Sequence, residues 1–226
     1  MSTVQSALSE TSDPRTARAD RRKADSRYRL LGAARKLFIE RGYHATRPQD
    51  IARAADVGHG TFYLHFAGKR ECFLAFVEQA SAELGTFVRE RLRTAQGVEA
   101  QISALLNGVL DYSERNPGVL KAAMTDLSMI APDAAPGATL IDRWAADWAA
   151  EIHLGAASGA IRAEYDPLVI GHAIVGLLSG GLRAGAKSGV ARGVMVDNLT
   201  RFLVRALVPD GAGGTASRHT FTMGKP

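Results

Sequence analysis

Apolar residues recur along this chain at the spacing of α-helices, and this periodicity is the feature that most constrains its fold. The first clear stripe begins near Ser26 and repeats at positions i, i+3, i+4, i+7 and i+8, as Leu30, Ala33, Ala34, Leu37 and Phe38. That spacing places the stripe on one face of an amphipathic helix. No segment alternates apolar and polar residues as a half-buried strand does. The sequence therefore predicts an all-α fold.

Glycine and proline divide the chain into further helices of the same period. Gly42 is expected to end the first helix as a left-handed cap, and Pro48 suits the first turn of the second. A tight turn at Asp56-Val57-Gly58 precedes a short third helix, and Asp166-Pro167 starts a later one. The helices are expected over residues 26–42, 48–55, 60–66, 69–95, 102–116, 118–130, 140–157, 167–186 and 189–207.

Composition sets limits on the class of protein. No unbroken run of 18 or more apolar residues appears, so we expect no membrane span, and the N-terminal residues lack the apolar core of a signal peptide. The single cysteine, Cys72, excludes an internal disulfide and fits a reducing compartment. Burial predicts an inert thiol there rather than a redox sensor. A cytoplasmic location is therefore expected.

Positive charge is concentrated in the first third of the 226 residues. From Asp13 to Arg70 there are 14 Lys and Arg residues against 6 Asp and Glu residues, while the whole chain carries only +5. This asymmetry is typical of a segment that faces a polyanion. A solvated basic surface is the alternative.

The stretch GHGTFYLHF, residues 58–66, carries the most specific functional signal. Phe62 and Phe66 are four residues apart and share the inner face of the third helix. Gly60 lets a partner approach the backbone closely. Polar groups of several lengths remain for the outer side, namely His59, Thr61, Tyr63 and His65. Two short helices joined by a turn, after a supporting helix, make a helix-turn-helix, whose second short helix lies in the major groove of DNA. A helical hairpin with exposed histidines is the alternative.

The run from Leu30 to Glu78 closely resembles the DNA-binding segment of the TetR family of transcriptional regulators. The matching positions are Ala33-Ala34, Leu37-Phe38, Gly42-Tyr43, Thr46, Asp50-Ile51-Ala52, Ala55, Val57, Gly60-Thr61, Tyr63, Phe66, Lys69 and Phe73. The resemblance implies a homodimer of two-domain chains. An N-terminal three-helix helix-turn-helix domain would bind a double-stranded DNA operator. A larger helical ligand-binding and dimerisation domain would follow, pairing through its last two helices. Binding of a small molecule would release the operator; most members repress and some activate.

Transferred position by position, the resemblance implies DNA contacts from Thr46, Arg47, His59, Gly60, Thr61, Tyr63, His65 and Lys69. The family often has Gly where Asp56 stands, Ser where Gly58 stands, and a hydroxyl residue where Arg47 stands, so no operator sequence is implied. The domains are then expected at residues 1–24 (a disordered basic arm), 25–70 (the DNA-binding domain), 71–208 (the ligand-binding and dimerisation domain) and 209–226 (a disordered tail). The basic arm is expected either to contact DNA weakly, along the backbone or in a minor groove, or to act only as a solubilising tail.

Aromatic residues and methionines of the second domain are candidates for an apolar ligand cavity with few polar anchors. The candidate ligand-binding residues are Phe76, Met124, Leu127, Trp144, Trp148 and His172. An ordinary core is the alternative for each of them. The last two helices offer small and apolar residues for a dimer seam, including Ser179-Gly180-Gly181 and Phe202.

No catalytic residue, metal site or cofactor is expected. The sequence contains no Gly-rich phosphate loop, nucleophile elbow or metal-ligand spacing. The leading interpretation is a ligand-responsive transcriptional regulator, a homodimeric repressor released from its operator by a small molecule. The alternatives are a regulator controlled by a protein partner and an all-helical enzyme.

Overall fold

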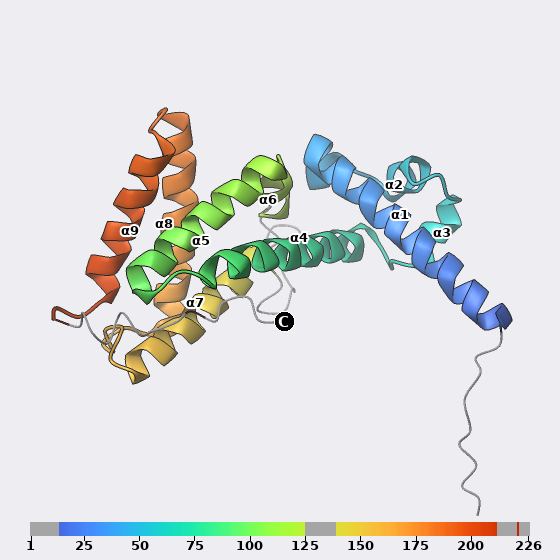
Figure 1. Ribbon diagram of the computed structural model, residues 1–226. Helices are drawn as coiled ribbons and strands as arrows, with labels where there is room; N and C mark the ends of the chain where they lie inside the picture. Colours follow the sequence, from blue (N-terminus) through green and yellow to red (C-terminus); the bar gives the residue numbers. More distant parts are fainter. Residues whose placement is uncertain (1–13, 125–138, 212–220, 222–226) are drawn as a thin grey trace, which may run out of the picture. The chain divides into compact units, whose positions relative to one another are not determined.

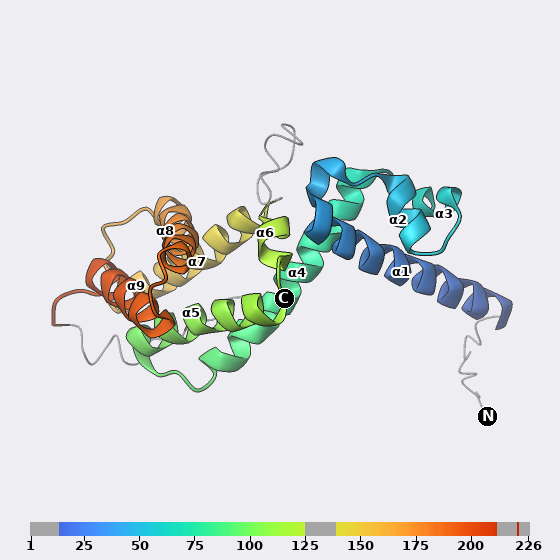
Figure 2. The same ribbon diagram turned by 90° about the horizontal axis from the view of Figure 1, so that it is seen from above.

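The computed structural model describes residues 14–124, 139–211 and 221, and every regular element in these ranges is an α-helix (Figures 1 and 2). The prediction of an all-α fold is confirmed. The chain divides into two compact units between Phe73 and Leu74. The helices are α1 (Pro14–Ala45), α2 (Pro48–Ala54), α3 (His59–Tyr63), α4 (Lys69–Leu92), α5 (Gly97–Arg115), α6 (Val119–Ala123), α7 (Leu140–Ala157), α8 (Pro167–Lys187) and α9 (Arg192–Leu207).

Helix α1 begins well before the predicted start at Ser26. The sequence predicts a disordered arm over residues 1–24, but the chain is helical from Pro14 onward. This part of α1 is rich in Ala, Arg and Lys, which favour helices. Its side chains are almost all exposed, so it lacks the apolar stripe by which the other helices are found. Gly42 breaks the helix with a positive φ (77°), but its ψ of 171° lies outside the predicted left-handed cap conformation, and helical backbone resumes for one turn afterwards.

In the first unit, α2 and α3 pack together and α2 packs on α1. Figure 1 shows both short helices beside α1. Pro48 occupies the first turn of α2, as predicted. The buried apolar core of this unit includes Leu30, Ala34, Leu37, Phe38, Tyr43, Ile51, Ala52, Ala55, Phe62, Phe66, Cys72 and Phe73.

In the second unit, α7 packs on α8, α5 packs on α9, and α8 also contacts α9. Local signals define where two of these helices begin. At α7, the Thr139 hydroxyl accepts a hydrogen bond from the Asp142 N–H at 2.9 Å, and the Asp142 carboxylate accepts one from the Thr139 N–H. At α8, the Asp166 carboxylate accepts from the Val169 N–H at 2.9 Å, and Pro167 follows. Such caps satisfy N–H groups that have no partner within the helix.

Helices α7 and α8 touch backbone to backbone at Gly171. A Cβ placed on Gly171 would lie 2.2 Å from the Ala145 carbonyl oxygen, a separation that no side chain tolerates. Because glycine has no Cβ, the two helices can approach this closely. No local sequence pattern predicts this contact at Gly171.

An ion-pair network joins the start of α9 to α5 and α4. The Arg192 guanidinium pairs with Asp111 and with Glu114, and Arg91 pairs with Asp111. Arg192 also donates to the Asn107 side chain and carbonyl. Partial burial tends to raise the pKa of Asp111, but the neighbouring guanidinium groups outweigh it and hold that pKa below its usual range.

The sequence predicts a disordered tail from residue 209, and most of that tail lies outside the described residues. Phe221 is an exception, because its side chain is only 4% exposed. Its ring lies edge-on to Trp148 with 5.5 Å between the ring centroids, and its N–H donates to the Gln101 side-chain oxygen at 2.5 Å. This residue of the tail is therefore packed against α5 and α7.

By length and composition alone, the segment Pro167–Gly185 of α8 could cross a membrane. Only 22% of this window is buried in the single chain. The sequence analysis does not identify it, because Ser179 and polar residues such as His172 and Arg183 interrupt the apolar run. One such helix is weak evidence for a membrane protein, and a helix with an exposed apolar face also suits pairing with another copy.

We expect Gly171→Ala to lower the free energy of unfolding by about 2 to 3 kcal/mol, because the new methyl group forces α7 and α8 apart. Urea denaturation would measure this. Gly32→Ala is the control, since an added Cβ at Gly32 in α1 meets nothing within 4 Å. That control should be neutral or stabilising by up to about 1 kcal/mol. Equal effects of the two substitutions would contradict the close contact.

Candidate nucleic-acid interface and cavity

Two buried phenylalanines determine which side of the short helix α3 faces outward. Phe62 is 0% exposed and Phe66 is 1% exposed, so the predicted inner face is confirmed. His59, Gly60 and Tyr63 are exposed, and Tyr63 keeps 51% of its surface. The rings of His59 and Tyr63 meet edge to face, 5.2 Å apart. The outer surface of α3 therefore presents an imidazole, a phenol and bare backbone side by side.

The turn before α3 is held in an unusual conformation by α1. Asp56 has φ 52°, and no other non-glycine residue among those described has a positive φ. The Arg29 guanidinium donates to the Asp56 carbonyl at 2.9 Å and to its carboxylate at 3.1 Å. Aspartate tolerates the left-handed region better than most residues, and the Arg29 contacts favour it here.

His65 is turned toward α1 rather than outward. Its Nε2 lies 2.7 Å from the Ser26 hydroxyl, and its carbonyl accepts a hydrogen bond from Arg27 at 3.3 Å. The Arg27 guanidinium also lies over the Phe66 ring, 4.6 Å from its centroid. Burial lowers the pKa of His65, and the nearby charges of Arg27 and Lys23 lower it further. The predicted DNA contact from His65 therefore competes with a contact inside the domain.

The predicted DNA contact from the Thr46 side chain is wrong. Thr46 is 0% exposed, so its hydroxyl cannot reach a ligand of any kind. The hydroxyl lies 2.8 Å from the Gly42 carbonyl and 3.3 Å from the Leu37 carbonyl, and its one proton can serve either. Thr46 thus adds a side-chain hydrogen bond to a carbonyl at the end of α1.

Lys69 opens α4 and reaches back to the end of α1. Its ammonium group donates to the Tyr43 carbonyl at 2.9 Å and to the His44 carbonyl at 3.4 Å, and it lies 4.2 Å from the centroid of the Tyr43 ring. Burial lowers the pKa of Lys69, and Arg47 adds to this effect. An ammonium group has three N–H donors, so one remains for an anion. Arg47, which precedes α2, is exposed, and Thr61 is half-buried.

Cys72 lies in the core of the first unit. It is fully buried, and burial raises the pKa of its thiol to about 12. The group therefore stays protonated and is a poor nucleophile at neutral pH.

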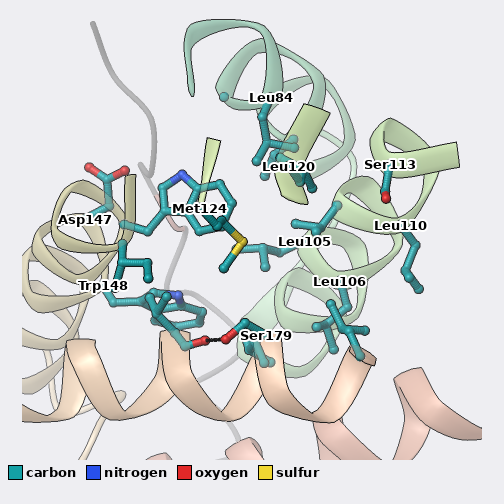
Figure 3. Close-up of a pocket in the computed structure, with 18 of the residues that line it drawn as sticks. Leu84, Leu105, Leu106, Leu110, Ser113, Leu120, Met124, Asp147, Trp148 and Ser179 are labelled. Carbon is teal, nitrogen blue, oxygen red and sulfur yellow. Dashed lines mark hydrogen bonds between the residues drawn. The ribbon is translucent and has the colours of Figure 1, made fainter. Parts of the chain in front are cut away.

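The second unit contains an apolar cavity of about 630 Å³. Ligand pockets in proteins commonly have volumes of about 300 to 1,000 Å³. Figure 3 shows Met124 projecting into the cavity between Leu105 and Trp148. The apolar wall consists of Leu84, Gly85, Val88, Leu105, Leu106, Val109, Leu110, Leu120, Met124, Ile141, Trp144, Trp148, Val175, Leu178 and Leu182.

Few polar groups line this cavity. The polar lining residues among those described are Ser113, Lys121, Asp147, Ser179 and Arg183. The Ser179 hydroxyl donates to the Val175 carbonyl of its own helix at 2.8 Å. Figure 3 shows Ser113 and Asp147 at opposite edges. Burial raises the pKa of the Asp147 carboxyl, and the nearby Glu151 raises it further.

Three of the six candidate ligand residues line the cavity, namely Met124, Trp144 and Trp148. Phe76 is not among its lining residues, and its side chain is fully buried elsewhere in the core. His172 is exposed on α8, because the inner face of that helix carries Gly171, Val175 and Leu178 instead. Phe76 and His172 therefore lie outside this cavity, and their assignment to a ligand site stays an untested prediction. Leu127 lies outside the described residues.

The apolar stripe of α5 was predicted from the sequence, but its residues, such as Leu105 and Leu106, were not predicted to line a ligand cavity. A stripe of helical period shows which residues point inward, and it cannot separate a filled core from a hollow one. The roles of Ser26 and Arg29 were not predicted either, because nothing in the local sequence links these two residues to the helix-turn-helix. Among the described residues, no cluster of His, Cys, Asp and Glu could hold a metal ion.

Residues 30–76 match a family model described as bacterial regulatory proteins of the tetR family. A curated relative, the HTH-type transcriptional activator FasR of Mycolicibacterium smegmatis, is 34% identical over 92 residues, which is 41% of this chain and 42% of the relative. The chain matches less than half of the length of the first curated relatives.

Solved structures of similar fold cover most of the chain. The fatty acid degradation regulator FadR from Bacillus halodurans has a TM-score of 0.63 and 18% identity, over 79% of this chain and 94% of that one. A gamma-butyrolactone receptor (ArpA-like protein) has a TM-score of 0.58 and 23% identity, over 84% and 91%. At these identities the likeness shows a common fold.

We expect Thr46→Val to lower the free energy of unfolding by about 1 to 3 kcal/mol, because it leaves a buried carbonyl without a donor. Thr46→Ser keeps the hydroxyl and should lose less. Urea denaturation would compare the two. A Val variant as stable as the parent would show that the hydroxyl is not needed at the end of α1.

We expect acidification to destabilise the fold through His65. Its pKa is lower in the folded than in the unfolded chain, so below about pH 6.5 the unfolded state binds the proton first. The contribution of His65 to the free energy of unfolding is therefore fully present above that pH. It falls as the pH decreases toward the pKa of the folded state. Denaturation at pH 7.5, 6.5 and 5.5 should show a smaller loss for His65→Asn than for the parent. Ser26→Ala keeps the histidine and should follow the parent; identical pH profiles for all three would exclude this role.

Proposed function

We propose, from the premise that this chain belongs to the TetR family of bacterial regulatory proteins, that it is a sequence-specific DNA-binding transcriptional regulator. The observation that carries this proposal is the outer surface of α3. Burial of Phe62 and Phe66 leaves His59 and Tyr63 exposed on a helix, and the major groove is wide enough to admit an α-helix. Together with Arg47 and Lys69, these residues offer groups for base edges and phosphates.

Gly60 supports the same assignment. It lies within α3, has no positive φ, and an added Cβ would meet nothing within 4 Å. The chain itself therefore has no steric need for glycine there, although glycine weakens a helix by about 1 kcal/mol relative to alanine. A partner that approaches the backbone closely, such as a DNA strand, supplies the reason.

We further propose that the cavity of the second unit binds a small, mainly apolar molecule and that binding releases the DNA. Its fifteen apolar wall residues against five polar ones favour a ligand with few polar groups. Proteins of similar fold are named for a gamma-butyrolactone and for fatty acid degradation, which fits a ligand of this chemical kind. Trp144 and Trp148 are the only tryptophans of the chain, and both line the cavity. Intrinsic fluorescence therefore reports its occupation without a label.

The proposed assembly is a homodimer paired through α8 and α9. An exposed stripe runs along α8 and includes Leu168, Val169, Ala173 and Gly176, and α9 exposes Phe202. Leu168 keeps 55% and Phe202 keeps 59% of their surface in the single chain. Two copies would bury these faces in a four-helix bundle, which also accounts for the apolar window of α8.

Repression is the proposed sign of control, with activation as the second candidate because one curated relative is named an activator. Transcription from the bound promoter in a purified system distinguishes the two. A regulator controlled by a protein partner would bind DNA but show no change in tryptophan fluorescence with any apolar compound. An all-helical enzyme would show no sequence-specific DNA binding.

We expect Tyr63→Ala to weaken operator binding at least 10-fold, while the oligomeric state stays unchanged. Gel shifts across a salt series would measure binding, first on the DNA upstream of the protein's own gene and then on random-sequence selections. Tyr63→Phe isolates the hydroxyl and should lie between the parent and the alanine variant. Parental affinity for Tyr63→Ala would show that α3 is not the reading helix.

A further inference from the structure

Helix α1 continues past the helix-turn-helix that it supports. In Figures 1 and 2 its N-terminal part extends beyond α3. From Ser26, which contacts His65 just after α3, to Arg15 the helix adds roughly 16 Å at 1.5 Å per residue. Nearly all described side chains of this part of the helix are exposed, so it contributes little to the buried core of the first unit. Its length therefore has no explanation in the core of the domain.

Contacts between α1 and the helix-turn-helix fix the direction of this extension. Ser26 lies 2.7 Å from the His65 imidazole, Arg27 donates to the His65 carbonyl, and Arg29 pairs with Asp56 in the turn. The helix is continuous from Pro14 through all three residues. The N-terminal part of α1 is therefore a rigid continuation of the helix-turn-helix domain.

The extension carries a basic stripe. Arg15, Arg18 and Arg22 follow one another at i, i+3 and i+7 and share one helix face. Ser26 and Arg29 continue the same spacing, so the stripe lies on the side of α1 that meets His65 just after α3 and Asp56 in the turn before it. Residues 15–29 contain seven Arg and Lys against two Asp. Within the described part of the chain, Arg18 and Arg22 form no ion pair.

We propose that the stripe of Arg15, Arg18 and Arg22 binds backbone phosphates of the DNA that flanks the operator, at a distance set by the contact between Ser26 and His65. This rests on the proposed function, since the stripe flanks an operator only if α3 reads one. An α-helix is about 10 Å wide and cannot enter a minor groove about 6 Å wide. The stripe therefore binds along the outside of the duplex. It lengthens the binding site by about five base pairs at 3.4 Å each.

The test replaces Arg15, Arg18 and Arg22 together by Gln, which keeps helix propensity. The probe is a duplex selected from random-sequence DNA with the full chain, either with its flanks or trimmed by about five base pairs on each side. Each lost phosphate contact lowers the slope of log affinity against log salt by about 0.9. The triple variant should lose about 2 to 3 units of slope per chain on the long duplex. Trimming should weaken the parent at least 10-fold and leave the triple variant almost unchanged.

Two controls make the result specific. Arg93, Arg115 and Lys187, all exposed in the second unit, are replaced by Gln to remove the same net charge; this variant should keep the parental slope and the parental response to trimming. Ala24→Pro breaks α1 between the stripe and Ser26, while Ala24→Ser preserves the helix. If the extension is rigid, trimming the DNA flanks should no longer weaken binding by Ala24→Pro, whereas it should still weaken binding by Ala24→Ser.

The outcomes are separable. Absence of selectable DNA for the parent would overturn the proposed function itself. A parent that binds, with a triple variant of equal slope and equal flank dependence, would overturn the phosphate-binding stripe and leave a solubilising surface. Retention of flank dependence by Ala24→Pro would overturn the fixed distance, because a flexible arm would then suffice.

Discussion

Burial of the Phe62 and Phe66 rings is the interaction on which the outward surface of α3 depends. Helix α3 has five residues, far below the length of about 12 to 15 at which an isolated helix becomes even marginally stable in water. Its helicity therefore comes from packing, and each buried ring contributes about 1.5 to 3 kcal/mol. The same two rings fix how far the helix is rotated about its axis. The outward positions of His59, Gly60 and Tyr63 follow from that rotation.

Local pattern was sufficient to predict the helices and much of this surface. Phe62 and Phe66 stand four apart, Pro48 and Pro167 begin helices, and Gly42 takes a positive φ, all as their chemistry predicts. The start of α1 could not be found in this way, because an exposed helix needs no apolar stripe. Propensity alone was the available signal there, and basic residues are also common in disordered arms.

Side-chain contacts between distant segments could not be predicted. His65 meets Ser26 across 39 positions of the sequence, and Thr46 turns inward to carbonyls of α1. Both residues match DNA-contact positions of the TetR resemblance, yet the His65 imidazole already contacts Ser26 and Thr46 is buried. Similarly, the periodicity of α8 marks an inner face without showing that His172 lies just off it. Whether a buried stripe encloses space depends on how several helices meet, which one sequence does not encode locally.

The close contact at Gly171 has a mechanical consequence for the second unit. The Ala145 carbonyl lies where a side chain of α8 would otherwise be, so α7 and α8 have no compressible layer between their backbones at this point. Interfaces of this kind shift as blocks and do not deform gradually. Helix α7 carries Trp148 in the cavity wall, and α8 carries both wall residues and the exposed stripe. A displacement of the Trp148 ring would therefore move α7 and α8 together as a rigid pair. The exposed stripe on α8 would move with them.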